Sequence, residues 1–342
     1  MNYLVRLLVV ALMVVFVFSD RLIPINPQAG KIVTMSEPIT DPLPHRQAVV
    51  AMNKGTVSAV VYDSNLPYKV GDMVIVTKDP QFENLYSVTD KVRTGSLYKL
   101  FILFIIAILA VSGVAGVRSL MGLAFSFAVI FMYVLPQIVL GGNPVTVALL
   151  ASALILSISY YLTHGLNHKS TIAILGTLAA LLLTGILASI FGSSAGLTGF
   201  GSEEAGFLLD RFPFESFYNL LLAGIIIGSL GVLDDITISQ ASIVAELSDS
   251  NPKFKMRELY VRAMHIGHDH ISSLVNTLVL VYTGSALPLL LLFVTSQATT
   301  FELLNYEAVA EEIVRTLVGS IGLVAAVPFT TLIASYWYTK KK

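Results

Sequence analysis

Long apolar stretches recur along this chain and constrain its fold more than any other feature. Most of them approach the 20 or so residues that an α-helix needs to cross the hydrocarbon core of a bilayer. Charged residues make up only 13% of the 342 residues, about half of the roughly 25% found in soluble domains. We therefore predict an all-α polytopic membrane bundle of about eight transmembrane helices, at residues 3–18, 98–116, 119–140, 145–163, 170–191, 218–240, 272–295 and 312–336.

The first apolar stretch is the weakest of these and admits two interpretations. Its apolar core, Leu7–Phe18, follows Arg6, an order that also fits the hydrophobic region of a signal peptide. No small-x-small cleavage site follows, because the chain continues Ser19-Asp20-Arg21. We predict a retained membrane anchor over residues 1–20, an extracytoplasmic segment over 21–97 and a helical transmembrane domain over 98–342.

Lysine and arginine in the loops indicate the orientation, because short cytoplasmic loops are enriched in these residues. The basic connections all fall on one side if the N-terminus is inside, and they contain Arg118, Lys169, Lys253, Lys255, Arg257, Arg262 and Lys340 to Lys342. The loops on the opposite side are 141–144, 192–217 and 296–311, and the last two carry glutamates such as Glu203 and Glu302. The pattern predicts that both termini are cytoplasmic.

Residues 21–97 form the one sizeable polar block, and the orientation places it outside. Alternating β-branched residues broken by Gly and Asp-Ser-Asn turns predict a small antiparallel β module over about 45–95. A module of this size has a marginal core. We expect it either to dock as a spacer or to contact a partner or substrate.

Two adjacent aspartates, Asp234 and Asp235, lie within the predicted span 218–240. A carboxylate at the centre of a membrane helix costs at least about 2.5–3.5 kcal/mol, so a pair implies a function or a buried partner. Three roles stay open for the pair: a proton or ion relay, a structural pairing between helices, and direct contact with a substrate. Adjacent like charges disfavour ionisation of both groups, which suits a relay.

A polar stripe continues from the pair along its helix, because Asp235, Ser239 and Glu246 share one face. The next predicted helix has a matching stripe that includes His265 and Asn276. We expect these two helices to be antiparallel neighbours whose stripes pack together and satisfy each other. The predicted supporting shell consists of Thr237, Ser239, Gln240, His268, Asp269, Asn276 and Thr277.

Several other classes of function are not indicated by the residues. The chain has no cysteine, which excludes disulfides, thiolate metal sites and cysteine nucleophiles. His265 and Asp269 have the i, i+4 spacing of helical metal ligands, but polar residues are expected at a cytoplasmic helix start, so we predict no metal. GLTGFG at 196–201 follows no strand, and we predict no cofactor. The net charge of −1 gives no sign of a nucleic-acid partner.

We also expect that the chain is not an enzyme. The acidic pair lies on one helix rather than on two facing helices, which argues against an aspartyl hydrolase. No serine nucleophile has a credible histidine base at the depth of the membrane.

Four blocks of the sequence resemble the YibE/F-like family of bacterial integral membrane proteins. They are TGFGSEEAG (198–206), LLAGIIIGSLGVLDDITISQASIVAEL (221–247), MHIGHDHISSLVNTLVLVYTGSALPLLLL (264–292) and VRTLVGSIGLVAAVPFTT (314–331). The chain looks like the members that carry two acidic residues. The resemblance implies a multi-pass protein of the bacterial inner membrane, and it implies architecture more than an activity.

The segment LGVLDDITISQASIVAEL is also similar to the acidic helix of the resistance-nodulation-division exporters. In those exporters the intramembrane aspartates serve proton coupling, and the resemblance implies that role for Asp234 and Asp235. The similarity covers the span 218–240, the linker that follows it and the next span, without the large external domains of those exporters.

The sequence thus predicts a proton- or ion-coupled transport or export component that uses the acidic pair. The alternative is a non-transporting scaffold, receptor or accessory subunit whose external β module binds a partner. The expected partners are the lipid bilayer and either further copies of the chain or another membrane subunit.

Overall fold

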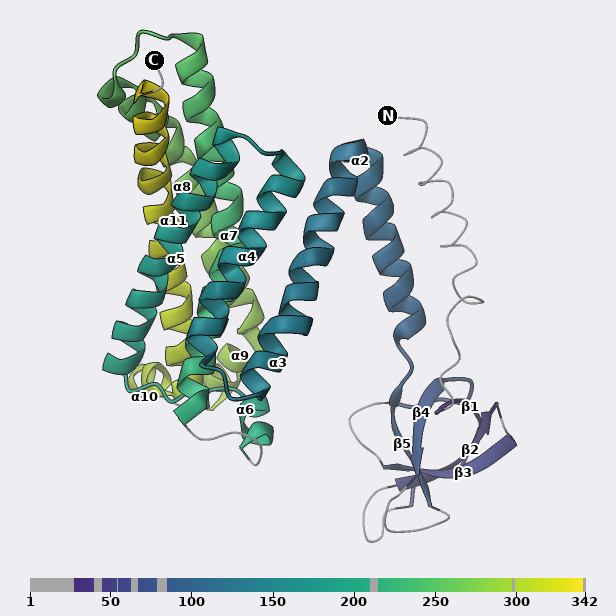
Figure 1. Ribbon diagram of the computed structural model, residues 1–342. Helices are drawn as coiled ribbons and strands as arrows, with labels where there is room; N and C mark the ends of the chain where they lie inside the picture. The colour runs from purple at the N-terminus through teal and green to yellow at the C-terminus, as the bar shows by residue number, and fades with distance from the viewer. Residues whose placement is uncertain are drawn as a thin grey trace. The chain divides into compact units, whose positions relative to one another are not determined.

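The fold was obtained as a computed structural model that describes residues 28–340 apart from 40–44, 54, 63–66, 79–84, 210–214 and 297–298. The predicted anchor at residues 1–20 lies outside the described residues. The chain forms two compact units, Met1–Val117 and Arg118–Lys342. Figure 1 shows that the first unit contains the strands and the second contains most of the helices.

The first unit contains a small closed β-barrel of five strands in the order β1-β2-β3-β5-β4. The strands are β1 (Ala29–Met35), β2 (His45–Met52), β3 (Gly55–Tyr62), β4 (Met73–Lys78) and β5 (Tyr86–Lys91). Alternation sets the core, since Ala48 and Val50 of β2 are buried while Gln47 and Val49 between them are exposed.

The barrel differs from the predicted antiparallel module at 45–95 in two ways. Strand β1 lies upstream of that range and pairs with both β2 and β4. Strands β3 and β5 pair in parallel, at Ala59 with Tyr86 and Val60 with Ser87. This short parallel contact closes the barrel, so β3 has no free edge there. Alternation within single strands could not reveal this pairing.

Helix α2 (Thr94–Val129) continues through the π-helical η1 (Ile130–Val134) into α3 (Leu135–Val139). The expected spans 98–116 and 119–140 both fall in this stretch, which counts as a single apolar helix of 46 residues. It is interrupted at Gly113, where φ is 58° and ψ is −127°. A left-handed φ of this kind suits glycine, which lacks a Cβ.

The second unit continues with α4 (Pro144–His164), α5 (His168–Ser194), α7 (Glu215–Ser250), α8 (Met256–Ser285), α9 (Leu287–Thr295) and α11 (Glu307–Lys340). Short helices α6 (Glu203–Leu208) and α10 (Thr300–Asn305) lie at the end of the bundle opposite the C-terminus (Figure 1). Asparagine side chains start two of the long helices: Asn143 accepts from the Val145 and Thr146 amides, and Asn167 accepts from the Ser170 amide.

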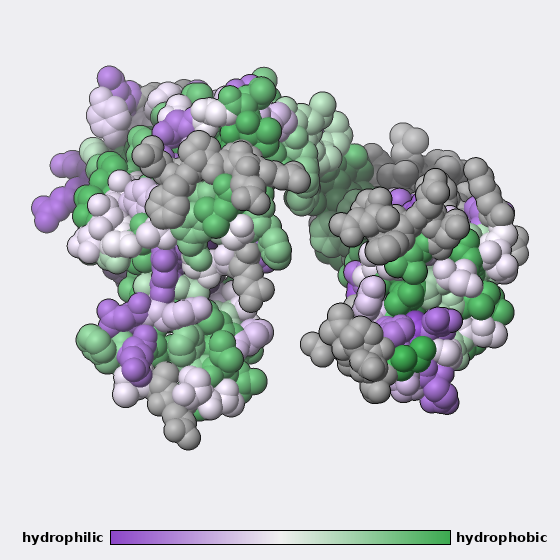
Figure 2. All heavy atoms as spheres, turned by 90° about the horizontal axis from the view of Figure 1, so that it is seen from below, coloured by the Kyte–Doolittle hydropathy of each residue, from purple (hydrophilic) through white to green (hydrophobic). Residues whose placement is uncertain are grey.

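Fewer spans than the predicted eight are found in the part of the chain that the structure describes. Five helices there are long and apolar enough to cross a membrane, or six if α8 and α9, bent by 60°, form one span. The difference has two sources. The stretch 3–18 is not described, and the two expected spans around residue 118 form one interrupted helix. Figure 2 views the helical unit from the end that carries α6 and α10, where hydrophobic and polar residues are interspersed.

Helices α5, α7 and α11 form the centre of the bundle, and small residues allow α5 and α11 to approach closely. A Cβ added at Gly176 of α5 would overlap the Thr330 hydroxyl of α11, and one added at Gly322 of α11 would overlap the Thr184 hydroxyl of α5. The two contacts are reciprocal and run in opposite chain order, so the helices are antiparallel. Each glycine lacks a side chain and so leaves space for the threonine of the other helix.

Different connections meet at the two ends of the bundle. At one end Lys169 pairs with Glu246 at 3.1 Å, and the His168 ring lies 5.6 Å from the Trp337 ring. At the other end Glu307 accepts hydrogen bonds from the Thr198 amide and hydroxyl at 2.5 and 2.6 Å. The connections predicted to be cytoplasmic therefore meet at the first end, and those predicted to be external meet at the second.

Candidate functional site

The acidic pair lies on α7 at a partly open cavity between helices of the helical unit. The cavity has a volume of about 460 Å³, and both Asp234 and Asp235 are among its lining residues. Asp235 is exposed and Asp234 is half-buried. A cavity of this size is in the range of roughly 300–1,000 Å³ that small-molecule sites occupy.

The wall of the cavity is polar near the pair and apolar further along. The polar lining consists of Ser119, Ser126, Ser159, Tyr160, Thr163 and His164 besides the two aspartates. The apolar lining consists of Leu123, Ile130, Ile155, Leu156, Ile227 and Leu230. These residues belong to α2, η1, α4 and α7. Two carboxyl groups, one imidazole and several hydroxyls together could hold a hydrated cation or pass protons.

A buried hydroxyl cluster fixes α7 at the level of the pair. The Tyr160 hydroxyl donates to the backbone carbonyl of Asp234 at 2.8 Å and lies 2.7 Å from Thr237 Oγ1. Thr177 Oγ1 lies 2.6 Å from Thr237 Oγ1 and donates to the Ala173 carbonyl at 2.9 Å. Helices α4, α5 and α7 are thereby tied together directly beside Asp234.

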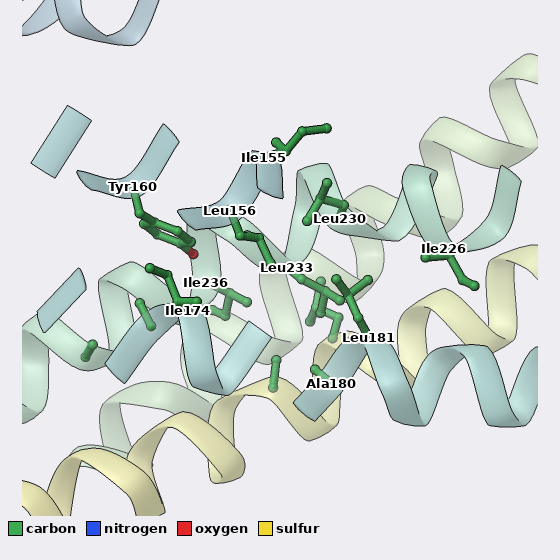
Figure 3. Close-up of a cluster of buried hydrophobic side chains, with 14 of the residues drawn as sticks. Ile155, Leu156, Tyr160, Ile174, Ala180, Leu181, Ile226, Leu230, Leu233 and Ile236 are labelled. Atoms are coloured by element: carbon green, nitrogen blue, oxygen red, sulfur yellow. The ribbon is translucent and has the colours of Figure 1, made fainter. Parts of the chain in front are cut away.

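The Tyr160 ring is held by apolar side chains, which keeps water from the hydroxyl cluster. Figure 3 shows the ring among Leu156, Ile174 and Ile236, with its oxygen toward α7. Tyr160 is only 2% exposed and Thr237 is fully buried. Hydrogen bonds in such a place are costly to leave unmade, so the position of the Asp234 backbone is well defined.

Helices α2 and α4 meet at Gly122 on the opposite wall of the cavity. A Cβ at Gly122 would lie 3.2 Å from Thr163 Oγ1 and 3.4 Å from Ser159 Oγ. Ser159 and Ser126 both donate to the Gly122 carbonyl, at 3.3 and 3.0 Å. The glycine thus brings two helices close enough for their hydroxyls to line one wall.

The pair lies between the middle of α7 and the end that carries the basic connections. Asp235 is about 16 Å along the helix from Glu246, at 1.5 Å per residue, and Glu246 marks that end through its ion pair with Lys169. His164, the last residue of α4, lines the cavity and lies one turn from Tyr160. The cavity therefore lies in the half of the bundle nearer the basic connections.

Two residues of the predicted supporting shell are buried on α7, and one is not. Thr237 belongs to the hydroxyl cluster described above. Gln240 is fully buried, and its amide nitrogen donates to the Ala263 carbonyl at 3.1 Å and to Thr331 Oγ1 at 2.7 Å. This amide links α7 to α8 and α11 instead of contacting the pair. Ser239 is exposed.

The expectation that the α8 stripe packs against the pair was wrong. His268, Asp269, Asn276 and Thr277 are exposed, and no residue of α8 lines the cavity. Thr277 Oγ1 donates to the Ser273 carbonyl of its own helix at 3.0 Å. Helix α8 instead buries the face formed by Leu259, Ala263, Gly267 and Leu278, because these apolar and small residues permit close packing.

The residues that do surround the pair come mainly from α4, and sequence reasoning missed them. Ser159, Tyr160, Thr163 and His164 lie at spacings of three and four at the end of a predominantly apolar helix. Helical periodicity indicates this polar stripe on α4 in the same way as it indicates the stripe on α7. Which of the two candidate stripes faces the aspartates required the tertiary structure.

The end of the bundle that carries α6 and α10 contains a second group of carboxylates, which hold a loop in place. Glu307 accepts from the Gly199 amide at 3.2 Å in addition to Thr198, and Glu311 accepts from the Gly201 amide at 3.0 Å. A Cβ at Gly199 would overlap the Phe217 carbonyl, and φ there is +88°. The glycine-rich loop is therefore shaped to fit these two glutamates.

Metal ligation has no geometric support among the residues that the structure describes, where no group of three or more His, Asp or Glu side chains could hold an ion. Arg315 forms an ion pair with Glu312 of its own helix at 3.1 Å.

The fold and the cavity define a multi-pass helical membrane protein that carries a small β-barrel. Its helical part, residues 100–340, matches the model of the YibE/F-like protein family. The chain belongs to this family. No curated protein and no solved structure matches the chain, so the resemblance to the resistance-nodulation-division exporters rests on the quoted segment alone.

Proposed function

We propose that the chain is a proton- or ion-coupled transport or export component. Asp235 is the group that gains and loses the proton or ion, and Asp234 is its partner. The lining of the 460 Å³ cavity carries the proposal, because it places both carboxyl groups beside an imidazole and several hydroxyls within the helical bundle. No catalytic step is part of the proposal.

The surroundings of the two aspartates support different roles for them. The backbone of Asp234 is anchored by Tyr160 and Thr237, at 2.8 and 3.1 Å from its carbonyl. Asp235 is exposed at the cavity, so an ion can reach it without breaking the buried cluster. An accessible carboxyl such as that of Asp235, beside a second carboxyl whose backbone is held in place, is an arrangement that intramembrane proton relays use.

A sequence repeat across α5 and α11 supports the transport class. Both helices contain Gly-x-x-Ala-Ala-x-x-x-Thr-x-x-x-Ala-Ser, at residues 176–189 and 322–335. The helices are antiparallel and share reciprocal glycine and threonine contacts. Many transporters are built from repeats of inverted topology and place their ion sites near the interface of the repeats. Helix α7, which carries the acidic pair, packs against both α5 and α11.

The proposal includes a topology in the inner membrane with both termini cytoplasmic. The stretch Thr94–Val139 has 46 residues, about 69 Å of helix, which is twice what one crossing of a 30 Å hydrocarbon core needs. We infer two crossings that meet near Gly113. Together with the described spans and an N-terminal anchor, this gives eight crossings with the basic connections inside.

Carbodiimide labelling of the purified protein in liposomes tests the relay without knowledge of the substrate. Dicyclohexylcarbodiimide is an apolar reagent that partitions into the bilayer and reacts with carboxyl groups it can reach there, so we expect it to modify Asp235, the exposed carboxyl at the cavity. Asp235→Asn should abolish this labelling and leave the folded yield unchanged. Glu246→Gln is the matched control, because it removes an exposed carboxyl from the same helix outside the cavity.

Proton flux into the same liposomes under an imposed potential completes the test. The wild type and Glu246→Gln should carry a flux that Asp235→Asn lacks. Wild-type flux and labelling in both Asp234→Asn and Asp235→Asn would overturn the proposal. Loss of folded protein in either variant would instead favour a structural pairing for that residue.

A scaffold or receptor role is the second candidate, and the barrel surface favours it. Val33, Val49, Tyr62, Val70 and Met73 expose between 37% and 60% of their surface, which is apolar area that a partner can cover. Under this alternative, Tyr62→Lys with Met73→Lys would abolish function in cells while both Asp→Asn variants stay active.

A further inference from the structure

Helix α8 presents polar side chains outward along a segment that belongs to a candidate membrane span. His265, Asp269, Ser272 and Asn276 are exposed and follow one another at spacings of four, three and four. The opposite face is buried against the bundle through Leu259, Ala263, Gly267 and Leu278. Nothing in the described part of the chain from 118 onward covers the polar face, which we call the α8 seam and define as these four exposed residues.

The depth of the seam follows from contacts of α8 with α7. The Ala263 carbonyl accepts from Gln240, and a Cβ at Gly228 would lie 3.6 Å from the Tyr282 hydroxyl. Asn276 therefore lies between the levels of Gln240 and Gly228 on α7, which is also the level of the acidic pair. Lipid cannot hydrogen-bond to an amide side chain at this depth, so another protein surface must cover it.

The spacing and chemistry of the seam fit a second copy of the same helix. A spacing of four, three and four is that of a left-handed helix pair. In a parallel two-fold pair each Asn276 meets its own copy, and an amide side chain both donates and accepts, so the two can satisfy each other. The side chains of His265 and Asp269 lie one turn apart on the helix. The imidazole of His265 in each copy can therefore donate to the carboxylate of Asp269 in the other copy.

We propose that the chain forms a homodimer in the membrane through parallel pairing of the α8 seam with the seam of a second copy. An apolar partner helix would leave Asn276 and Asp269 unpaired in the bilayer, whereas a second copy supplies matching groups at the same depth. The inference does not depend on the proposed transport role, because no α8 residue lines the cavity.

Cysteine crosslinking tests the pairing directly, and the natural chain contains no cysteine. Single variants Asp269→Cys, Ser272→Cys and Asn276→Cys are oxidised in native membranes. We expect each to give a disulfide-linked species with the mass of two copies. Leu182→Cys on α5 is the matched control, since Leu182 is 54% exposed on another helix of the bundle; it should stay monomeric.

The strength of the pairing is measured by dilution of labelled protein in liposomes. Interhelical hydrogen bonds in membranes average about 0.6 kcal/mol, so loss of two reciprocal bonds in Asn276→Val should raise the dissociation constant about sevenfold. Asn276→Gln should retain much of the affinity.

Three results would overturn the inference. Asn276→Cys could remain monomeric on oxidation although it is folded. Leu182→Cys could crosslink as efficiently as the seam positions. The crosslinked species could have a mass other than two copies, which would assign the seam to a different membrane subunit.

Discussion

Removal of the Tyr160 hydroxyl should destabilise the helical unit by an amount that its contacts allow us to calculate. The hydroxyl donates to the Asp234 carbonyl at 2.8 Å and lies 2.7 Å from Thr237 Oγ1. Each net hydrogen bond contributes about 0.5–1.5 kcal/mol, so Tyr160→Phe should lower the free energy of unfolding by about 1–3 kcal/mol. The lower half of this range is expected, because Thr237 and Thr177 still bond to each other at 2.6 Å.

The neighbouring tyrosine provides a matched control. Tyr161 makes one hydrogen bond, to Thr171 Oγ1 at 3.1 Å in a partly buried position. Tyr161→Phe removes the same atom one residue away and should lower the free energy of unfolding by about 0.5–1 kcal/mol. The difference between the two variants isolates the contribution of the buried cluster from the general effect of losing a hydroxyl.

The assay is equilibrium unfolding of the full chain in mixed micelles, followed by the fluorescence of Trp337. This is the single tryptophan of the chain, and its ring lies 5.6 Å from the His168 ring. A double-mutant cycle between Tyr160→Phe and Thr237→Val should give a coupling of about 0.5–1.5 kcal/mol. The reasoning is refuted if Tyr161→Phe costs as much as Tyr160→Phe, or if the cycle shows no coupling.

Three further predictions concern other parts of the molecule. Gly176→Ala should overpack the α5–α11 contact and cost about 1–3 kcal/mol, and Thr330→Ala in the same chain should restore part of it by removing the overlapping hydroxyl, as measured by the same unfolding assay. Glu307→Gln should speed amide exchange at Thr198 and Gly199, because the neutral amide is a weaker acceptor for their amides. A hydrogen bond from Lys91 lowers the pKa of Asp72 below its usual 3.8. The barrel should therefore lose stability as the pH falls through the lowered pKa of Asp72.

Each of these predictions has a control in the same chain. Gly224→Ala adds a Cβ where nothing lies within 4 Å, and it should cost little. Glu302→Gln should leave amide exchange at Thr198 unchanged, because the hydrogen bonds of this exposed glutamate stay within the start of α10. A folded-state pKa below the unfolded one gives stability that is complete above the unfolded value and is lost as the pH falls through the folded value, so Asp72→Asn should flatten the acid dependence of barrel exchange. Equal acid sensitivity in that variant would contradict the assignment.

Much of the helical architecture could be predicted from local patterns in the sequence. The long apolar stretches, the asparagines that begin α4 and α5, and the alternation in β2 each describe residues close together in the chain. The acidic pair was recognisable for the same reason, since a carboxylate within an apolar run is a local anomaly. The boundary near residue 118 was not predictable, because the stretch keeps helical hydrogen bonding except at Gly113.

The residues around the acidic pair were decided by tertiary contacts. Periodicity identified polar faces on α7 and α8 but could not tell which face meets which neighbour. The structure places Tyr160 and His164 of α4 at the pair and turns Asn276 of α8 away from it. The small and apolar face of α8 packs better against the bundle than a polar face would.

The sequence by itself determined that this chain crosses a membrane many times and that two carboxyl groups lie within one crossing. Insertion into a bilayer depends on the composition of each segment, and composition is a local property. Only the tertiary structure decided that α2, α4 and α7 enclose a cavity around those carboxyl groups. It also decided that Gly176 and Gly322 receive threonines from each other's helix. Contacts between residues far apart in the chain depend on how side chains fit in three dimensions, which no single segment specifies.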